Sequence, residues 1–379
     1  MTSRVGVLGG SGACGVSAAS VLHTMGYSLR IGGRSIEVLR GVAERELNSQ
    51  AEAAAVDVYD DALLEKFCAD CDVIVNCAGP SYRIGDRVAQ AAFAAGASYV
   101  DVAGDDPLRD RLTRDAAAGV PETVTAVVSA GVQPGVSGIL PRWLAAEHLD
   151  TVSHALIYAG GLEHVTPAAA GDYLISLGDG HGDALAAWRG GRIEYRALQP
   201  LSNTELPHFP TSVTAYPHLA AETVRLARDL GADSLDWYNV SAGEQLLLWM
   251  NRLRDRNWLQ ADEAELAEGV AQLEQAGAVD LAGRTPYYLQ AVQLDGLVGG
   301  RSDTLSAVFR TRDSYRVSGS VAGLSADAVL RGEVPPGCHF AEEVLEPGQA
   351  LQALRKFGAV TSLEVLNAPL HADAEEGTV

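Results

Sequence analysis

Basic side chains are scarce in this sequence, and lysine is nearly absent from it. The 379 residues include 28 basic and 49 acidic side chains, which give a net charge of −21, and the two lysines are Lys66 and Lys356. Nucleic acids and anionic membrane surfaces attract proteins through Lys and Arg. The sequence therefore predicts neither of them as a partner. The shortage of lysine also argues against a mechanism through a lysine Schiff base.

Cysteine is scarce as well, and its five positions form an odd set without the spacing of a disulfide framework. Cys68 and Cys71 form a C-x-x-C pair, but no second pair and no nearby histidine completes a zinc site. We therefore expect no bound metal, and free thiols in a reducing compartment, which predicts a cytoplasmic protein. We also expect no secretory leader and no membrane-spanning segment, because no apolar run is long enough.

The first third of the sequence alternates regularly between two patterns. The expected strands are 4–9, 28–32, 53–58, 73–77, 98–102 and 123–129, and the expected helices are 14–25, 35–46, 60–69, 86–95 and 107–118. Strand–helix–strand units repeated this often imply right-handed crossovers and a parallel sheet. The predicted fold class is α/β, with an N-terminal Rossmann-type, doubly wound parallel sheet.

After about residue 130 the rhythm changes to longer, alternating strands, which predicts an α+β domain with a mixed sheet. Strands are expected at 154–159, 192–197, 287–294 and 304–311, and helices at 220–230, 243–254 and 262–276. The link through Gly299 and Gly300 predicts an antiparallel hairpin. Residues 318–331 are rich in small side chains and are expected to form a helix that approaches another element closely. The predicted domains are 1–130, 131–340 and a segment 341–379 that returns to the first domain, with a loose tail from about His371.

A glycine-rich turn follows the first expected strand. Gly9 permits a tight turn, Gly12 lets the backbone approach a pyrophosphate, and Gly15 lets the next helix pack against the sheet. The N-terminus of that helix offers N–H groups and a positive dipole end to the phosphates. A strand before the turn and a helix after it are the context that a dinucleotide-binding motif requires, and the alternative is a turn that binds nothing. The predicted cofactor residues of this turn are Gly9, Gly10, Ser11, Gly12, Ala13 and Gly15.

The end of the second strand indicates which dinucleotide is bound. An NAD site places a carboxylate there to hold the ribose 2′-hydroxyl, whereas an arginine pairs with a 2′-phosphate. This sequence has Gly33, Arg34 and Ser35 at that point and no carboxylate. It therefore predicts NADP(H), with a solvated surface arginine as the alternative. Asp57, after the third strand, is predicted either to accept a hydrogen bond from the adenine amino group or to cap the following helix.

The fourth strand ends in a further predicted cofactor segment. Ala78, Gly79 and Pro80 fit a rigid turn at the carboxyl edge of the sheet, where ligands of doubly wound folds bind. The alternative is an ordinary turn between a strand and a helix.

These segments together resemble the saccharopine dehydrogenase-like family of NADP-binding oxidoreductases. The resemblance rests on VGVLGGSGACG, on IGGRS, and above all on VIVNCAGPSYRIGDRVAQAAFAAGASYVDVAGD at residues 73–105, and it becomes patchy after the first third. It implies an N-terminal Rossmann domain, a central domain for substrate binding and homodimer formation, and a C-terminal segment that folds back. Gln133 stands where many relatives have Asp, which puts the role of that acid in doubt.

Reduction by NADPH needs one group that manages a proton, because protonation makes an imine a good hydride acceptor. The candidates at the carboxyl edge are Asp101, Tyr99, Asp105 and Tyr82. Tyr99 and Asp101 alternate along one strand and are expected to share a face, whereas Asp101 and Asp105 fall on the family's acidic element. The alternatives are a core tyrosine for Tyr99 and a helix cap for Asp105.

The sequence as a whole predicts an NADPH-dependent reductase of a C=N bond in an amino-acid-derived or secondary-metabolite pathway, acting on a small molecule. One alternative is reduction of a C=C or C=O bond by the same cofactor. Another is a non-catalytic NADP(H)-binding regulator or partner protein, which the glutamine at Gln133 favours. A resemblance of fold does not choose among these functions.

Overall fold

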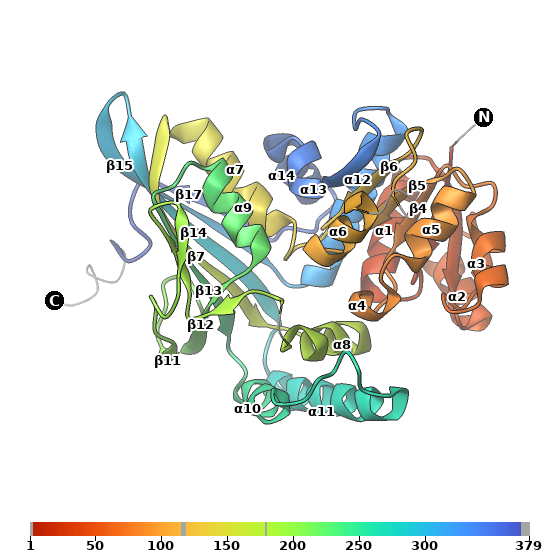
Figure 1. The fold of residues 1–379 in the computed structure, drawn as a ribbon, viewed down its shortest axis with the longest axis horizontal. Helices are drawn as coiled ribbons and strands as arrows, with labels where there is room; N and C mark the ends of the chain where they lie inside the picture. The colour runs from red at the N-terminus through yellow and green to blue at the C-terminus, as the bar shows by residue number, and fades with distance from the viewer. Residues whose placement is uncertain (1–2, 115–118, 179, 373–379) are drawn as a thin grey trace. The chain divides into compact units, whose positions relative to one another are not determined.

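A computed structural model describes residues 3–114, 119–178 and 180–372 (Figure 1). The chain divides into two compact units, which are described separately. The first contains the residues up to Val136 together with Tyr315–Ala359, and the second contains Ser137–Ser314 together with the chain from Val360.

These boundaries differ from the expected 1–130, 131–340 and 341–379. The chain returns to the first unit at Tyr315, before the expected boundary, and leaves it again at Val360. The early return follows from the packing of the helix that begins there, described below. The expected loose tail falls mostly on residues 373–379, and the end of the helix expected at 107–118 falls on residues 115–118, which lie outside the described residues.

The first unit is built on a seven-stranded sheet in the order β16-β6-β5-β4-β1-β2-β3, with every neighbouring pair parallel. Its strands are β1 (Arg4–Leu8), β2 (Ser28–Gly33), β3 (Ala51–Ala55), β4 (Val73–Asn76), β5 (Ser98–Asp101), β6 (Thr125–Val128) and β16 (Gly337–Phe340). All four residues of β4 are buried, as the apolar run had indicated for a central parallel strand. The predicted Rossmann-type parallel sheet is thus confirmed.

The helices of this unit follow the strands in regular alternation. They are α1 (Ala13–Thr24), α2 (Ile36–Glu46), α3 (Asp61–Cys68), α4 (Ser81–Ile84), α5 (Arg87–Ala94), α6 (Asp106–Arg114), α12 (Ser314–Leu330), α13 (Ala341–Val344) and α14 (Pro347–Lys356). The buried Arg30 fixes one of these junctions, because its guanidinium donates to the carbonyls of Phe67 and Ala69 at the end of α3, at 2.8 and 2.7 Å. A cation at a helix C-terminus also complements the helix dipole.

Helix α12 carries the small residues that predicted a close approach, and its partner is α1. A Cβ atom on Gly319 would lie 2.1 Å from the carbonyl oxygen of Cys14, so the two backbones touch where only glycine fits. The Ser17 hydroxyl donates to the carbonyl of Arg316 at 2.7 Å, and the Tyr27 hydroxyl donates to Asp327 at 2.7 Å. This contact explains why the chain joins the first unit already at Tyr315.

The second unit is built on a ten-stranded mixed sheet, whose main path is β10-β9-β13-β7-β14-β15-β17. Its strands are β7 (Thr151–Leu162), β8 (Asp183–Ala184), β9 (Ala187–Arg189), β10 (Arg192–Glu194), β11 (Leu201–Thr204), β12 (Val213–Leu219), β13 (Ser234–Ser241), β14 (Tyr287–Val298), β15 (Arg301–Thr311) and β17 (Ser362–Leu366). Strands β13 and β7 are parallel, whereas β14 pairs antiparallel with β7 and β15. The predicted mixed sheet is confirmed, and so is the hairpin, which turns through Gly299 and Gly300 at φ of 57° and 77°.

Helices α7 and α9 lie along one side of this sheet, and α8, α10 and α11 form a group at its lower end in Figure 1. Their bounds are α7 (Val136–His148), α8 (Pro167–Ser176), α9 (Ala221–Asp229), α10 (Glu244–Leu253) and α11 (Glu263–Leu281). The sequence analysis missed the helices α7 and α8 and six strands of this unit, β8, β9, β11, β12, β13 and β17. Pro141 lies inside α7, and because proline is unfavourable in a helix interior, the local sequence did not predict this helix.

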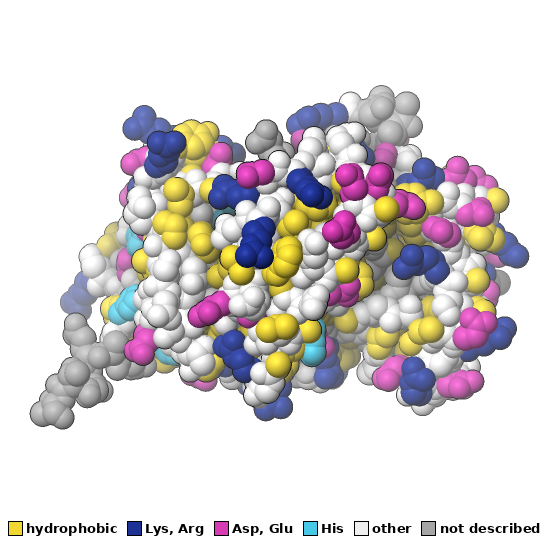
Figure 2. Space-filling model, turned by 90° about the horizontal axis from the view of Figure 1, so that it is seen from below, with side chains coloured by type: hydrophobic (Ala, Val, Ile, Leu, Met, Phe, Trp, Pro, Cys, Tyr) yellow, Lys and Arg dark blue, Asp and Glu magenta, His cyan; other side chains and the backbone are white. Residues whose placement is uncertain are grey.

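Within the described residues, no helix is both long enough and apolar enough to cross a membrane. Acidic, basic and hydrophobic side chains are interspersed over the face shown in Figure 2, so this face presents no continuous basic surface.

Candidate functional site

The candidate site lies at the carboxyl edge of the parallel sheet of the first unit. Strand β1 pairs with β2 on one side and with β4 on the other, so the strand order reverses at β1. Ligands of doubly wound sheets bind outside the carboxyl ends of the strands at this kind of reversal. The glycine-rich turn after β1 is located there.

Gly9 and Gly15 make this turn possible. Gly9 has a φ of 70°, and a Cβ atom on it would lie 2.6 Å from the backbone of Cys77 after β4. A Cβ atom on Gly15 would lie 2.1 Å from the carbonyl oxygen of Gly9. No other residue fits either position without moving backbone, so the turn lies against both β4 and the start of α1.

Gly12 has a different environment, which fits a phosphate cradle. Its added Cβ would meet one atom within 4 Å, the carbonyl oxygen of Gly9 at 3.3 Å, so the space above it is open. Gly12 is the N-cap of α1, and Ser11, Gly12 and Ala13 are exposed. Gly10 is buried instead, and its added Cβ would lie 2.9 Å from Cβ of Ile31. An exposed helix N-terminus without a side-chain cap can hold the pyrophosphate of a dinucleotide.

The turn after β2 contains the residues that are predicted to contact the 2′-phosphate of NADP(H). Arg34 is exposed and forms no ion pair with any residue that the structure describes. Ser35 caps α2, where its hydroxyl oxygen accepts from the Val38 N–H at 3.4 Å and donates to Glu37 at 3.2 Å. The Arg34 guanidinium is therefore available to an anion, beside Gly33 at the strand end.

Asp57 was predicted to contact adenine or to cap a helix, and the second alternative is wrong. Its carboxylate accepts from the backbone N–H of Tyr59 at 3.0 Å, which closes a local turn. Helix α3 is capped by Asp60, which accepts from Leu63 N–H at 3.0 Å. Asp57 is exposed, and contact with adenine stays a prediction.

Tyr99 and Asp101 are joined in a buried network with Asn76. The Tyr99 hydroxyl donates to Asp101 Oδ2, the Asn76 amide donates to the same oxygen at 3.0 Å, and Asp101 Oδ1 accepts from Ala103 N–H at 2.9 Å. The exposed fractions of Tyr99 and Asp101 are 0% and 2%. Asn76 also accepts from the N–H of Ala78 at 3.2 Å, so the network reaches the turn after β4.

Burial dominates the electrostatics of this network. It raises the pKa of Asp101, although the hydrogen bonds from Tyr99, Asn76 and the Ala103 backbone oppose the shift. Burial, with the adjacent Asp101, raises the pKa of Tyr99 well above its ordinary value. Because every polar atom of Asp101 is engaged inside the fold, the geometry favours a positioning role over direct proton donation by either residue.

Tyr82 and Asp105 form a second pair with a different environment. The Tyr82 hydroxyl in α4 donates to Asp105 Oδ2 at 2.8 Å, and both residues are partly exposed. The backbone carbonyl of Asp105 accepts from Leu108 N–H at 3.0 Å, so Asp105 also begins α6. Two of the four candidate catalytic residues are thus brought together where a ligand can reach them, after β4 and β5.

The turn that leads to α4 contains the remaining predicted segment. Gly79 is exposed, and the Gly79–Pro80 peptide bond is cis. Pro80 is the N-cap of α4, so the turn carries Tyr82 into place. The sequence analysis did not assign a role to Asn76, which links this turn to Asp101, although Asn76 is part of the N-x-A-G-P segment that carries the resemblance.

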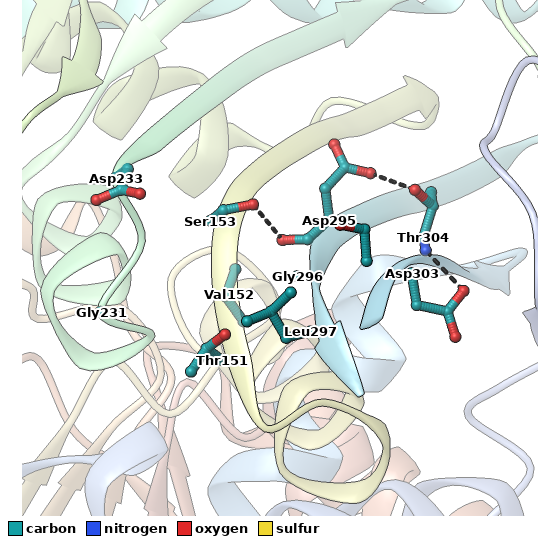
Figure 3. Close-up of a pocket in the computed structure, with 11 residues that line it drawn as sticks. Thr151, Val152, Ser153, Gly231, Asp233, Asp295, Gly296, Leu297, Asp303 and Thr304 are labelled. Carbon is teal, nitrogen blue, oxygen red and sulfur yellow. Dashed lines mark hydrogen bonds between the residues drawn. The ribbon is translucent and has the colours of Figure 1, made fainter. Parts of the chain in front are cut away.

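A separate pocket of about 760 Å³ occurs in the second unit, and it contains none of the predicted site residues (Figure 3). Asp295 lies on its wall, where it accepts from the Thr304 hydroxyl at 2.8 Å and faces His154 Nδ1 at 3.1 Å. Asp236 and Asp295 raise the pKa of His154 against the effect of its burial. Among the described residues, no group of His, Cys, Asp and Glu is arranged to hold a metal ion.

Comparisons with known proteins agree with the geometry of the first unit. Residues 5–130 match the family model of the saccharopine dehydrogenase NADP binding domain. A relative named "Lipid droplet localized protein" from Caenorhabditis elegans is 29% identical over 132 residues, which are 31% of this chain and 31% of the relative. The match therefore spans about a third of that relative's length.

Likeness to a solved structure extends over the whole fold. Apo saccharopine dehydrogenase (L-Glu forming) from Saccharomyces cerevisiae superposes with a TM-score of 0.67 at 15% identity, over 96% of this chain and 100% of that chain. At this identity the likeness shows the fold. The family model and the glycine turn together show that the first unit binds NADP(H). Residues 5–130, about a third of the chain, are thus similar to the NADP-binding domain of the saccharopine dehydrogenase family, and the fold of the whole chain is similar to that of saccharopine dehydrogenase.

Proposed function

We propose that this protein is an NADPH-dependent reductase of a C=N bond in a small molecule of an amino-acid-derived or secondary-metabolite pathway. The observation that carries the proposal is the partly exposed Tyr82–Asp105 pair, which lies on the same sheet edge as the glycine cradle. Reduction of an imine needs a hydride and one proton. The glycine cradle is suited to bind the cofactor that supplies the hydride, and the Tyr82–Asp105 pair is suited to supply the proton.

The cofactor supplies the hydride when it is bound. The turn around Gly12 and the N-terminus of α1 hold the pyrophosphate, and Arg34 with Ser35 holds the 2′-phosphate. The Tyr82 hydroxyl donates its proton to the imine nitrogen, and Asp105, which accepts a hydrogen bond from that hydroxyl, orients it while a proton from solvent restores the tyrosine. The buried Asn76–Tyr99–Asp101 network keeps the ends of β4 and β5 in register, and it positions the turns that carry the pair.

The first test is a calorimetric titration of the full chain with NADPH and with NADH, followed by a screen of cyclic and open-chain imines. We expect tight NADPH binding, weak NADH binding and oxidation of NADPH with at least one class of imine. Failure of both cofactors to bind would contradict the cofactor assignment. Oxidation of NADPH with enones or ketones but not with imines would contradict the C=N assignment.

The screen also decides between the two alternative functions. Activity on C=C or C=O bonds supports the first alternative. NADPH binding without turnover of any class supports a non-catalytic NADP(H)-binding regulator. Gln133 favours the regulator, because an amide stands where many relatives of the resembled family carry an acid, and it is exposed on the loop after β6.

We further infer that the protein acts as a homodimer in the cytoplasm. The charge of −21 and the free thiols support this location. Light scattering of the purified full chain tests the dimer, and a single-chain mass would contradict it.

A further inference from the structure

A group of hydrogen-bonding side chains is assembled in the second unit, at the end of its sheet where β7 stops and α9 begins. We call it the acceptor cluster, and its members are Ser137, Glu163, Glu222, Tyr288 and Gln290. Tyr288 and Gln290 alternate along β14 and therefore share one face of the sheet.

The backbone register leaves small residues beside this pair. Strand β7 places Gly161 opposite Tyr288 and Ala159 opposite Gln290. Directly paired residues of neighbouring strands lie on the same face, so two large polar side chains stand beside two very small ones.

Gln290 contains an acceptor that nothing in the described chain satisfies. Its side-chain N–H donates to the carbonyl of Ser137 at 3.0 Å, which fixes the orientation of the amide. The opposite end, Oε1, is buried and has no hydrogen-bond partner, although Gln290 is 0% exposed. Buried polar atoms without partners are rare because each costs the free energy of its lost hydration.

The same network continues to a carboxylate. The Ser137 hydroxyl, at the start of α7, donates to Glu222 Oε1 in the first turn of α9 at 2.5 Å. Glu222 is 8% exposed. A carboxylate near two helix N-termini interacts favourably with both helix dipoles.

Glu163 is the second carboxylate and the accessible one. It is partly exposed just after β7, and its Oε1 accepts from the backbone N–H of Ser314 at 2.7 Å. It forms no ion pair with any Arg, Lys or His that the structure describes. Glu163 and Glu222 both lie near enough to Tyr288 to add to the effect of burial, which raises the pKa of that hydroxyl far above its ordinary range.

We propose that the acceptor cluster is a subsite for a protonated amine, bound between Glu163 and Gln290 Oε1 with Glu222 behind them. An ammonium group has three donors and no acceptor. It can therefore donate a hydrogen bond to Gln290 Oε1 and act as the positively charged partner of the Glu163 carboxylate. A neutral carbonyl or alkene substrate supplies neither. The inference rests on the proposed function for the statement that this amine belongs to the reaction, and it names the residues that recognise it.

The test uses n-butylamine as the probe and n-butanol as the neutral comparison, each titrated into the full chain with and without saturating NADPH and followed by ligand-observed NMR. We expect saturable binding of n-butylamine, weakened about tenfold in Glu163→Gln and in Gln290→Met, because a charge-assisted hydrogen bond is lost. Butanol signals should not differ among the variants. Acidification should also release the amine from the wild type, because burial raises the pKa of Glu163 and protonation removes its charge.

Glu346→Gln is the matched control, because Glu346 also accepts backbone N–H groups at a helix start, those of Gly348 and Gln349, but in the first unit. It should bind n-butylamine as the wild type does. Gln290 is buried, so circular dichroism must first show that Gln290→Met is folded. Glu163→Gln keeps the shape of a partly exposed side chain and decides the question if Gln290→Met is not folded.

Equal n-butylamine binding in wild type and Glu163→Gln, or no saturable binding to the wild type, would overturn the subsite. The subsite and the proposed reaction fail in different ways. If the wild type binds n-butylamine, the variants do not, and no imine is reduced, the subsite is supported and the proposed reaction is contradicted. If imines are reduced and Glu163→Gln leaves KM unchanged, the proposed reaction is supported and the subsite is contradicted.

Discussion

Two tyrosine–aspartate pairs lie at the same edge of the parallel sheet, and their environments differ. The Tyr99–Asp101 pair is buried, and Asn76 and Ala103 N–H complete its hydrogen bonds. The Tyr82–Asp105 pair is partly exposed, on a short helix and a helix start. The same two residue types therefore hold the fold together in one place and are open to a ligand in the other.

The comparison teaches that residue type and strand position are insufficient to assign a catalytic role. Asp101 fell on the family's most distinctive segment and followed a strand, as a catalytic acid often does. Its burial shows that a residue can be part of a distinctive segment because it orders the turns around a site. Four experiments can break or sharpen the contrast between the two pairs.

The largest expected effect comes from the exposed pair. Tyr82→Phe and Asp105→Asn should each lower kcat by about 10²–10⁴-fold with little change in NADPH affinity, because a proton-transferring group is lost. Steady-state kinetics on an imine identified by the screen measures this. Tyr195→Phe, which alters a tyrosine that is 66% exposed, is the control and should change nothing. Unchanged kcat in both test variants would remove the pair from the mechanism.

The buried pair should respond in stability instead. Asp101→Ala leaves the Tyr99 hydroxyl and the Ala103 N–H without their acceptor and removes one of the two acceptors of the Asn76 amide, so we expect the free energy of unfolding to fall by about 3 kcal/mol. Asp105→Ala should cost about 1 kcal/mol, because it removes one partly exposed hydrogen bond, that from the Tyr82 hydroxyl. Urea unfolding measures both. A stable Asp101→Ala protein without turnover would reverse the roles assigned to the two pairs.

A smaller effect is expected at the cofactor turn that lies beside both pairs. Arg34→Ala should weaken NADPH binding about tenfold and leave NADH binding unchanged, because an exposed guanidinium that pairs with a phosphate is partly screened by solvent. Arg40→Ala, an exposed arginine on α2, is the control. If the preference for NADPH survives in Arg34→Ala, the 2′-phosphate assignment is incorrect.

The smallest expected effect is a pH dependence that belongs to the buried pair alone. The pKa of Asp101 is raised in the folded state from its usual value of 3.8, so the folded chain binds this proton more tightly than the unfolded chain does. The resulting contribution to stability is present below pH 3.8 and is lost as the pH rises from there through the raised pKa. Urea midpoints of wild type and Asp101→Asn across this window should converge toward the acid side. Parallel midpoint curves for the two proteins would contradict the shift.

Several features of the fold could be predicted because their signals are local. The alternation of strands and helices, the hairpin at Gly299 and Gly300, and the close approach of α12 each follow from residues near in sequence. The sequence analysis missed strand β13, although β13 pairs with β7, β9 and β12 in the interior of its sheet. Asp60, rather than Asp57, caps α3, because Asp60 directly precedes the first helical residue whereas Asp57 closes a turn with Tyr59.

The sequence by itself determined the parallel sheet, the glycine turn and the choice of cofactor. The sheet and the turn depend on local apolar patterns and on the steric demands of single glycines. Tertiary structure alone decided that Asp101 is buried, that Asp105 meets Tyr82, and that Tyr288 lies near Glu163 and Glu222. Those outcomes depend on which distant backbones pack over a side chain, because burial sets both its solvation and the partners within reach.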